Sequence, residues 1–303
     1  MNKKLGTFFT MFSATLLGLT PILCTYTYDM GATPETLVFL RNFFCIPVLY
    51  IILKLKKIDL SLNKTELIKI ILISVFGITS TTLLLYSAYN YLPVGMVTTL
   101  HFLYPFFVML IGFIFFKEHI SNAKKVILFF ATVGIFLFVD FNELAGQQSV
   151  LFGIFISILS GITYALYMSG VEHLGIKHIN DLKLTFYFSL FASITCFIYA
   201  IATHRFTVFQ MEANGILLAF VISMCTSFLA IFTLQLGIKS LGASTAAIFC
   251  MFEPVMAVIG GFLFLHERLT LMKMLGCIII LSSVILLSIL NKREDQKLKD
   301  QFK

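Results

Sequence analysis

Charged side chains are scarce in this sequence. Only 12% of its 303 residues are charged, whereas 59% are hydrophobic. A soluble domain of this size needs far more polar side chains to cover its surface. The composition therefore excludes a soluble globular protein and indicates an integral membrane protein.

The sequence also lacks the short alternation of polar and apolar residues that marks the strands of an outer-membrane β-barrel. Runs such as LLGLTPILC and GCIIILSSVILLSIL are apolar on every face instead. Charge-poor runs recur roughly every 30 residues, which suits a helical span of about 20 residues and its loop. We therefore expect an all-α polytopic membrane protein.

Motifs of metal and catalytic sites are missing. The six cysteines lie in apolar runs without CxxC or CxxH spacing, so neither a disulfide framework nor a zinc site is expected. There is no HExxH, no GxSG-type serine and no nucleotide-binding loop. We expect no catalytic residues, no metal and no cofactor.

Apolar runs bounded by charged or turn residues predict ten spanning helices. Their approximate ranges are 7–27, 34–53, 67–88, 93–116, 123–140, 151–171, 183–202, 214–236, 242–265 and 272–290. With the amino terminus inside, 18 of the 22 basic residues fall on the inner side, which predicts that both termini are cytoplasmic. This sorting also accounts for the net charge of +7, so no nucleic-acid partner is expected.

An internal repeat is visible when residue n is set against residue n + 149. The offset aligns residues 92–121 with residues 241–270 and places Pro105 on Pro254. Each half then holds five spans, and because five is an odd number, the second half has the opposite orientation in the membrane. We expect three regions: a first five-helix repeat (1–145), a second, inverted five-helix repeat (146–291) and a charged cytoplasmic tail (292–303).

The clearest motif lies at the end of each repeat. In the second half, FEPVMAVIGGFLFLHERLT combines Glu-Pro, a run of small residues and a closing Glu. In this pattern the chain resembles the EamA-type transporters of the drug/metabolite transporter (DMT) superfamily, over nearly its whole length. The resemblance implies a multi-pass carrier of the bacterial inner membrane, often an exporter of amino acids or other small metabolites. One departure is Tyr104, which stands where the second half has Glu253.

Glu253 is expected near the bilayer midplane, where a carboxylate costs about 2.5 to 3.5 kcal/mol on insertion scales and so faces a cavity or a partner. It is either a proton carrier or a structural acid that holds helices together. Pro105 and Pro254 each remove a backbone donor in mid-span and predict a kink. Their symmetry favours a hinge for alternating access over a static bend.

Three more polar residues lie within the first four spans. His101 and Tyr104 are three residues apart and share a helix face. His101 is either a cavity residue or a helix-to-helix hydrogen-bonding residue. Arg41 lies about 10 Å into the second helix. It either snorkels to the outer headgroups or pairs with Glu253 or a carboxylate substrate.

The remaining candidates are tyrosines and amides. Tyr86 and Asn90 share a face at the end of the third helix, and the repeat sets Tyr86 against Gln235 in the eighth. Tyr164 and Tyr167 form an i, i+3 pair in the sixth helix, after a stripe of small residues that predicts close helix packing. We expect these side chains along the substrate pathway, with an interfacial belt as the alternative for Asn90.

Glu118 and its counterpart Glu267 lie at membrane boundaries, ahead of Ser121 and Thr270. Because these two residues are good N-caps for the following helix, we expect the acids to have structural roles.

We interpret the chain as a secondary-active transporter that binds a small-molecule substrate in a central cavity and alternates its access, with membrane lipid around it and protons as a candidate coupling ion. The cavity is expected between helices 1, 3, 4, 6, 8 and 9, with helices 5 and 10 at the periphery. A passive facilitator is the first alternative, and an intramembrane enzyme or receptor is less favoured. The substrate, the direction of transport and the oligomeric state stay open.

Overall fold

The computed structural model describes residues 3–88, 90–92, 94–138, 150–264, 266 and 269–301. Every regular element in this part of the chain is helical. Inside a bilayer no water is present to bond backbone groups, so a span must satisfy them within its own helix. The predicted all-α class is confirmed.

Polar caps fix several helix starts. Asn63 and Glu66 form a capping box at the start of one helix. The hydroxyls of Ser121 and Thr270 each accept a backbone N–H three residues later, as expected from the sequence. In chain order the helical elements are α1 (Lys3–Asp29), α2 (Pro34–Phe43), α3 (Cys45–Leu55), α4 (Lys64–Leu72), η1 (Ile73–Thr79), α5 (Ser80–Ala88), α6 (Val94–His101), α7 (Tyr104–Phe116), α8 (Asn122–Phe136), α9 (Val150–His173), α10 (Asp181–Ala202), η3 (Val208–Gln210), α11 (Ala213–Ile222), η4 (Ser223–Ala230), α12 (Ile231–Leu241), α13 (Ala243–Cys250), α14 (Glu253–Phe264) and α15 (Leu271–Gln301).

Among the described residues, nine helical segments are long and apolar enough to cross a membrane. The expected fifth span, residues 123–140, contains α8, which has 15 residues. This is shorter than the roughly 20 residues that a span needs. Residues 139 and 140 of the expected span lie outside the described residues, so the tenth span stays a prediction.

The expected fourth and ninth spans are each interrupted. In the first half α6 ends at His101 and α7 begins at Tyr104, and in the second half α13 ends at Cys250 and α14 begins at Glu253. Each mid-span proline is thus the second residue of a new helix, where its missing N–H would have no intrahelical partner. The predicted kinks are therefore interruptions of two residues that divide each span into two shorter helices.

Two π-helical segments lie in the third and eighth spans. η1 separates α4 from α5, and η4 separates α11 from α12. Their first residues, Ile73 and Ser223, are 150 positions apart, close to the repeat offset. Segments of this kind are rare and frequently lie at functional sites. The residue pattern did not predict them.

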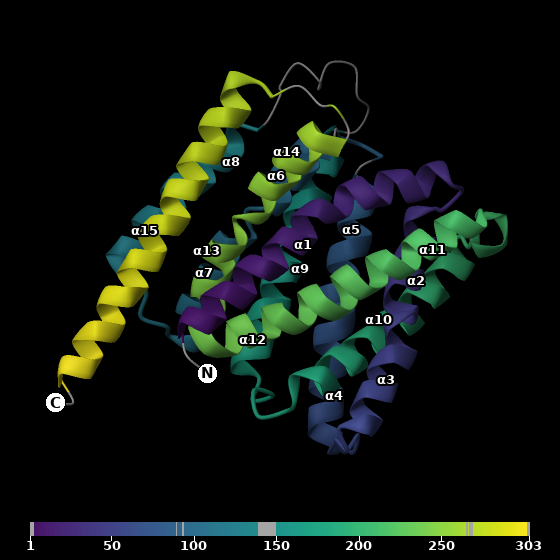
Figure 1. Cartoon of the computed structure of the whole chain (residues 1–303), viewed down its shortest axis with the longest axis horizontal. Helices are drawn as coiled ribbons and strands as arrows, with labels where there is room; N and C mark the ends of the chain where they lie inside the picture. The colour runs from purple at the N-terminus through teal and green to yellow at the C-terminus, as the bar shows by residue number, and fades with distance from the viewer. Residues whose placement is uncertain are drawn as a thin grey trace.

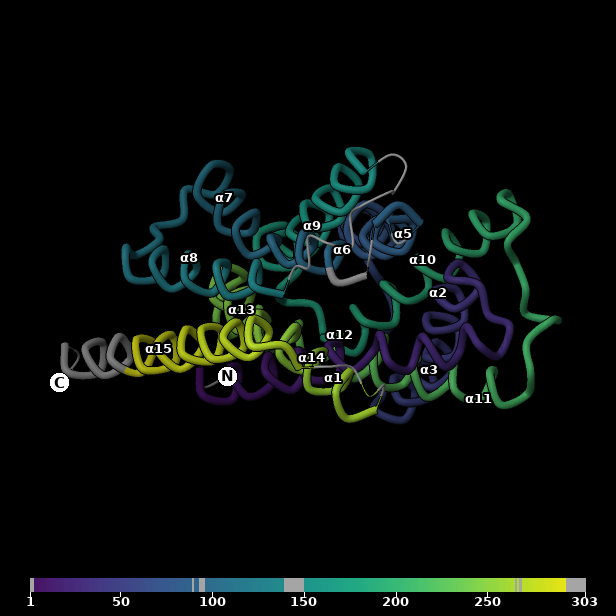
Figure 2. The backbone as a smooth tube through the Cα atoms, turned by 90° about the horizontal axis from the view of Figure 1, so that it is seen from above, coloured from purple at the N-terminus to yellow at the C-terminus, as the bar shows by residue number. Residues whose placement is uncertain are grey.

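The first helix of each half packs against the other half. α1 packs along α12 and α14, whereas α9 packs along α5 and α7 (Figure 1). Gly6 of α1 lies against Ser240, and Gly153 of α9 lies against Leu92, each too close to leave room for a side chain. Figure 2 shows α7, α8 and α9 on one side of the bundle and α1, α11 and α15 on the other. The two halves therefore share one packed interior.

α8 and α15 pack mainly on each other along one side of the molecule (Figure 1). Gly134 and Gly276 meet where the two helices cross, and a β-carbon at Gly276 would lie 2.5 Å from the Gly134 carbonyl oxygen. This placement agrees with the peripheral position expected for the fifth and tenth helices.

Candidate functional site

An aromatic cluster surrounds the break between α6 and α7. The His101 ring lies 5.6 Å from the rings of Tyr104 and Tyr164, which meet edge to face at 4.7 Å. Tyr167 extends the group along α9, with its ring 5.8 Å from that of Tyr164. All four side chains are buried. These residues, here called the central cluster, join α6 and α7 of the first half to α9 of the second.

Three hydroxyl groups of the central cluster lack hydrogen-bond partners within the described part of the chain, those of Tyr104, Tyr164 and Tyr167. His101 differs, because its Nδ1 lies 2.9 Å from the Ser160 hydroxyl. An unpaired buried hydroxyl costs about 1 to 3 kcal/mol. The three phenols thus retain their capacity to bond to a polar ligand.

The break between α13 and α14 brings a carboxyl group to the same region. Glu253 is the first residue of α14, and its Oε2 is buried without a hydrogen-bond partner among the described residues. The carboxyl lies within electrostatic range of the Tyr104 and Tyr164 hydroxyls. Cys250, the last residue of α13, faces Tyr104. The two breaks therefore place polar groups from both halves around one buried region.

Pro105 and Pro254 are both buried. Each directly follows the first residue of its helix, Tyr104 in α7 and Glu253 in α14. Their fixed φ angle sets the direction of the first helical turn. Before Pro105 the backbone bonding shortens, with the Leu103 N–H donating to the Leu100 carbonyl instead of a carbonyl four residues back. Both prolines are placed where a hinge was predicted, and the hinge motion itself stays a prediction.

Arg41 is held by the π-helical segment η4. Its Nε donates to the Ser227 hydroxyl at 3.1 Å, and its backbone carbonyl accepts from the Ser223 hydroxyl at 2.6 Å. Among the described residues no direct ion pair joins Arg41 to Glu253, although the guanidinium lies within electrostatic range of that carboxyl. Pairing with Glu253 was one of the alternatives left open by the sequence. The Ser227 hydroxyl thus positions the guanidinium through its Nε atom. The two terminal nitrogens of the guanidinium are not used in this bond.

Gln235 and Tyr86 lie on opposite halves, as the repeat predicted. Gln235 is fully buried in α12, where its Nε2 donates to the Thr185 hydroxyl at 3.0 Å and its Oε1 has no partner in the described chain. The Tyr86 hydroxyl lies 3.8 Å from the Cys24 sulfur. Asn90 occupies an exposed turn after α5, outside the buried site. Its position agrees with the interfacial alternative.

The residues that hold these side chains were not singled out from the sequence. Ser160 directly precedes Gly161, the last residue of the small-residue stripe Gly153, Ser157 and Gly161. That stripe signalled close packing but gave no indication of a bond from Ser160 to His101. Ser227 meets Arg41 only because η4 packs beside α2. Such partners follow from the relative positions of helices, which a sequence pattern does not contain.

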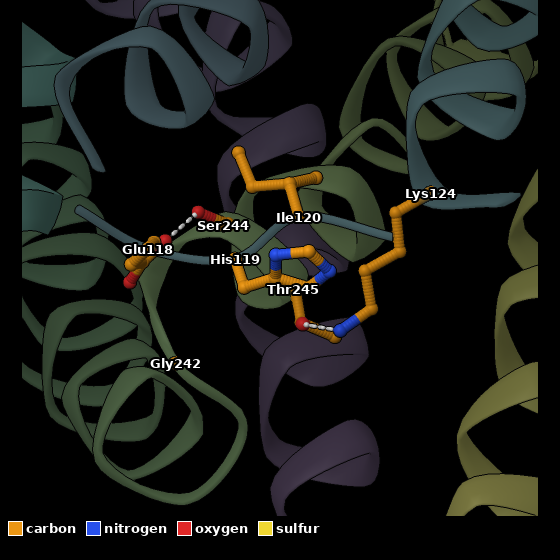
Figure 3. Close-up of a pocket in the computed structure, with 7 residues that line it drawn as sticks. All are labelled: Glu118, His119, Ile120, Lys124, Gly242, Ser244 and Thr245. Atoms are coloured by element: carbon orange, nitrogen blue, oxygen red, sulfur yellow. Dashed lines mark hydrogen bonds between the residues drawn. The ribbon is translucent and has the colours of Figure 1, made fainter. Parts of the chain in front are cut away.

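The loops at 56–63, 117–121 and 174–180 lie at one end of the bundle, here called the lysine-rich end. A second polar region lies at this end. A cavity of about 260 Å³ opens there between the end of α7 and the start of α13, lined by Glu118, His119, Ile120, Lys124, Gly242, Ser244 and Thr245 (Figure 3). The Ser244 hydroxyl donates to Glu118 at 2.7 Å, and the Lys124 ammonium donates to Thr245 at 3.1 Å (Figure 3). Glu118 therefore bonds across the two halves in addition to preceding the Ser121 cap.

Three potential metal ligands, Glu118, Glu172 and His173, bring their ligand atoms within 4.8 Å of one another at this end. Each is already engaged. The His173 Nε2 lies 3.0 Å from Glu118 and 3.6 Å from Glu172, and Glu172 also pairs with Lys177 at 3.0 Å. The contacts of His173 with the two acids and the pairing of Glu172 with Lys177 account for the close approach of these three side chains.

Comparison with known proteins gives a consistent result. The model of the EamA-like transporter family matches the chain twice, over residues 4–140 and 151–289. The chain is 29% identical over 215 residues to the uncharacterized transporter sll1319 of Synechocystis, an alignment that covers 68% of this chain and 62% of that relative. It is 25% identical over 283 residues to the uncharacterized transporter YcbK of Bacillus subtilis, covering 90% of this chain and 89% of YcbK.

A crystal structure with 15% sequence identity superposes with a TM-score of 0.78, covering 97% of this chain and 99% of that one. At this level of identity the similarity demonstrates a shared fold. The arrangement of helices described above is thus one that another chain of nearly the same extent also adopts.

Proposed function

The chain belongs to the EamA-like transporter family, and from the geometry of its buried site we propose that it is a secondary-active transporter that works by alternating access. The pair of helix breaks carries this proposal. Tyr104 and Glu253, the first residues after the breaks, are 149 positions apart, and both present buried polar atoms without partners in the described chain. Carriers built from repeats commonly bind their substrates at such discontinuous helices.

The proposed topology has ten spans in two inverted five-helix repeats, with both termini in the cytoplasm of a bacterial cell and the spans in its inner membrane. The lysine distribution supports the orientation. The reciprocal packing of α1 and α9 supports the repeat, because each first helix takes the same place against the opposite half.

The proposed substrate is an amino acid or a related small metabolite, and the proposed direction is export. The carboxyl of Glu253 suits an ammonium group, the guanidinium of Arg41 suits a carboxylate, and the tyrosine hydroxyls bond to either. Glu253 is also the proposed site of proton coupling, because an ionisable group inside a span commonly belongs to a substrate or proton pathway.

The test is counterflow in proteoliposomes across a panel of amino acids, nucleosides and amphiphilic cations, with and without an imposed pH gradient. Saturable exchange of one class, accelerated by the gradient, supports a proton-coupled carrier. If the rate of exchange is the same with and without the pH gradient, the protein is a passive facilitator instead.

Two controls accompany the counterflow assay. Liposomes without protein measure leakage, and a variant on the outer surface, Phe129→Ala, measures the effect of substitution as such. Phe129 of α8 is 64% exposed in the chain and does not belong to the central cluster. Absence of saturable exchange for every class, with Phe129→Ala and the parent protein equally well folded, contradicts the proposal.

A further inference from the structure

One contact at the lysine-rich end joins the end of α9 to the end of α7. The rings of His173 and Phe116 stack with their centroids 4.0 Å apart and an interplanar angle of 12°. The His173 Nε2 also lies 3.0 Å from the Glu118 carboxylate. Since α9 belongs to the second half and α7 to the first, this contact holds the two halves together.

Glu118 makes a second bond to the other half. Its Oε2 accepts a hydrogen bond from Ser244, near the start of α13, at 2.7 Å (Figure 3). The side chains of His173 and Glu118 are 19% and 23% exposed. Water therefore reaches both groups and can replace their contacts when the helices separate. We call Phe116, Glu118, His173 and Ser244 the Glu118 latch.

The opposite end of the bundle has a matching contact. Tyr26, near the end of α1, donates its hydroxyl to the Phe264 carbonyl at the end of α14, at 3.0 Å. Tyr26 and His173 are 147 positions apart. Gly6 and Gly153 have the same separation, and so do the first residues of the two family matches, so Tyr26 and His173 occupy equivalent positions in the first helices of the two halves. Phe264 corresponds in the repeat to Phe115, the neighbour of Phe116. The pair Tyr26 and Phe264, here called the Tyr26 latch, thus occupies nearly the same place in its half as His173 and Phe116.

The two latches lie on either side of the central cluster. α9 carries Tyr164 and Tyr167 of that cluster and ends at the Glu118 latch, while α14 begins at Glu253 and ends at the Tyr26 latch. Each latch joins a first helix to a broken span of the other half. Loss of one latch with the other intact would leave a connection between these helices at one end only.

Resting on the alternating-access function proposed above, we propose that the Glu118 latch and the Tyr26 latch are the two gates of the transport pathway. The gate at the lysine-rich end is formed by side chains, including an acid and a histidine. The other gate uses a tyrosine and a backbone carbonyl. The two gates therefore respond to different substitutions.

The native thiol of Cys250, buried beside Tyr104, reports whether a gate is open. The other five cysteines, which are all free thiols, are replaced by alanine. The labelling rate of Cys250 by a small impermeant thiol reagent is then measured in proteoliposomes sorted by orientation. No substrate is needed for this measurement.

We expect Glu118→Gln and His173→Ala each to raise the labelling rate several-fold from the face that bears the lysine-rich end. Tyr26→Phe is expected to raise it from the opposite face. The matched control is Lys177→Ala, because Lys177 pairs with Glu172 at 3.0 Å within one half and at the same end of the bundle. His173→Gln, which keeps a hydrogen-bonding group, serves if His173→Ala does not fold.

Unchanged labelling in well-folded Glu118→Gln and His173→Gln overturns the gate assignment, as does an equal rise in Lys177→Ala. Counterflow measured on the same variants distinguishes failure of the gate assignment from failure of the proposed transport function. Normal transport with unchanged labelling contradicts the gates alone, whereas gated labelling in a protein that transports nothing in the panel contradicts the proposed function alone.

Discussion

The backbone carbonyl of Glu253 lies directly against Gly18, where a β-carbon would overlap its oxygen and would also come within 2.8 Å of the Met256 Cβ. The first helix of the chain thus touches the second break at its opening residue. A glycine is required at position 18 by this close approach.

Gly18→Ala should therefore destabilise the protein by about 1 to 3 kcal/mol, the usual cost of overpacking. On helix propensity alone the same change would stabilise α1 by about 0.5 to 1 kcal/mol. The sign of the change in melting temperature decides between the two. Phe12→Ala, at a position 38% exposed on the same helix, is the control for losing a lipid-facing side chain.

Removing an unpartnered phenol hydroxyl should separate stability from function. Tyr104→Phe and Tyr164→Phe are expected to keep or raise the free energy of unfolding, by up to about 1 kcal/mol, because no internal hydrogen bond is lost. Both should slow counterflow if the hydroxyls bind substrate. Tyr187→Phe is the contrasting variant, since its hydroxyl donates to the Leu60 carbonyl at 2.7 Å and its loss should cost about 0.5 to 1.5 kcal/mol.

Glu253→Gln keeps the shape of the side chain but cannot ionise. A proton-coupled carrier should then lose its response to an imposed pH gradient while its abundance in the membrane is unchanged. Counterflow rates measured over a range of pH test this. A variant with normal rate and normal pH response leaves Glu253 with a structural role only.

Arg41 and Glu253 form no direct ion pair, which makes a quantitative prediction about the double variant. Because Arg41 is bonded to Ser227 and the Glu253 Oε2 has no hydrogen-bond partner among the described residues, the effects of Arg41→Ala and Glu253→Gln on unfolding should add to within about 0.5 kcal/mol. A coupling energy clearly above that value would show that the two side chains interact directly. Thermal unfolding of the parent, both single variants and the double variant completes the cycle.

The ion pair between Glu35 and Arg205 should respond unequally to loss of either partner. Their nitrogen and oxygen atoms are 2.8 Å apart, but the Glu35 side chain is 7% exposed and that of Arg205 54%. The hydrogen bond to Glu35 raises the pKa of Arg205, which therefore stays charged. Arg205→Gln leaves a buried carboxylate without its ion-pair partner and should cost about 1 to 3 kcal/mol. Glu35→Gln only releases an exposed guanidinium and should cost about 1 kcal/mol or less.

Cysteine labelling tests the proposed orientation. In a background without native cysteines, Asn122→Cys at the lysine-rich end should resist an impermeant reagent added to intact cells. Phe209→Cys, at a residue 94% exposed in the loop after α10, should react. The reverse pattern would place the lysine-rich end outside the cell.

Composition and periodicity were sufficient to predict the helices, because a long apolar run without charge has few structural alternatives in a bilayer. The prolines correctly marked the two interrupted spans, although the chain breaks before Pro105 and not at it. The π-helical turns were missed, since nothing in the residue pattern of 73–79 distinguishes them from a regular helix. Their geometry depends on neighbouring helices.

The four residues of the central cluster were each named from the sequence as candidates for the substrate pathway, a role that stays a prediction, and their mutual contacts were only partly foreseen. His101 and Tyr104 were placed together from their spacing, which is local information. For Arg41 the sequence left open the outer headgroups, Glu253 or a carboxylate substrate as partners. The side chain is held by Ser227, because the registry between α2 and η4 decides that contact. A pattern along one chain segment records which face a residue occupies, and it does not record which residue lies opposite.

The exchange of first helices between the halves imposes an order on biosynthesis. α1 is synthesised well before the helices that cover its glycines, since α12 and α14 lie more than 200 residues later, beginning at Ile231 and Glu253. During synthesis α1 therefore lacks these two packing partners until the helices of the second half have been inserted. In a chain stopped after the first half, α5 and α7 would lack their packing partner α9. Likewise α1 would lack its partners α12 and α14. A quality-control protease that recognises exposed small-residue helix faces would thus distinguish a truncated product from the finished protein.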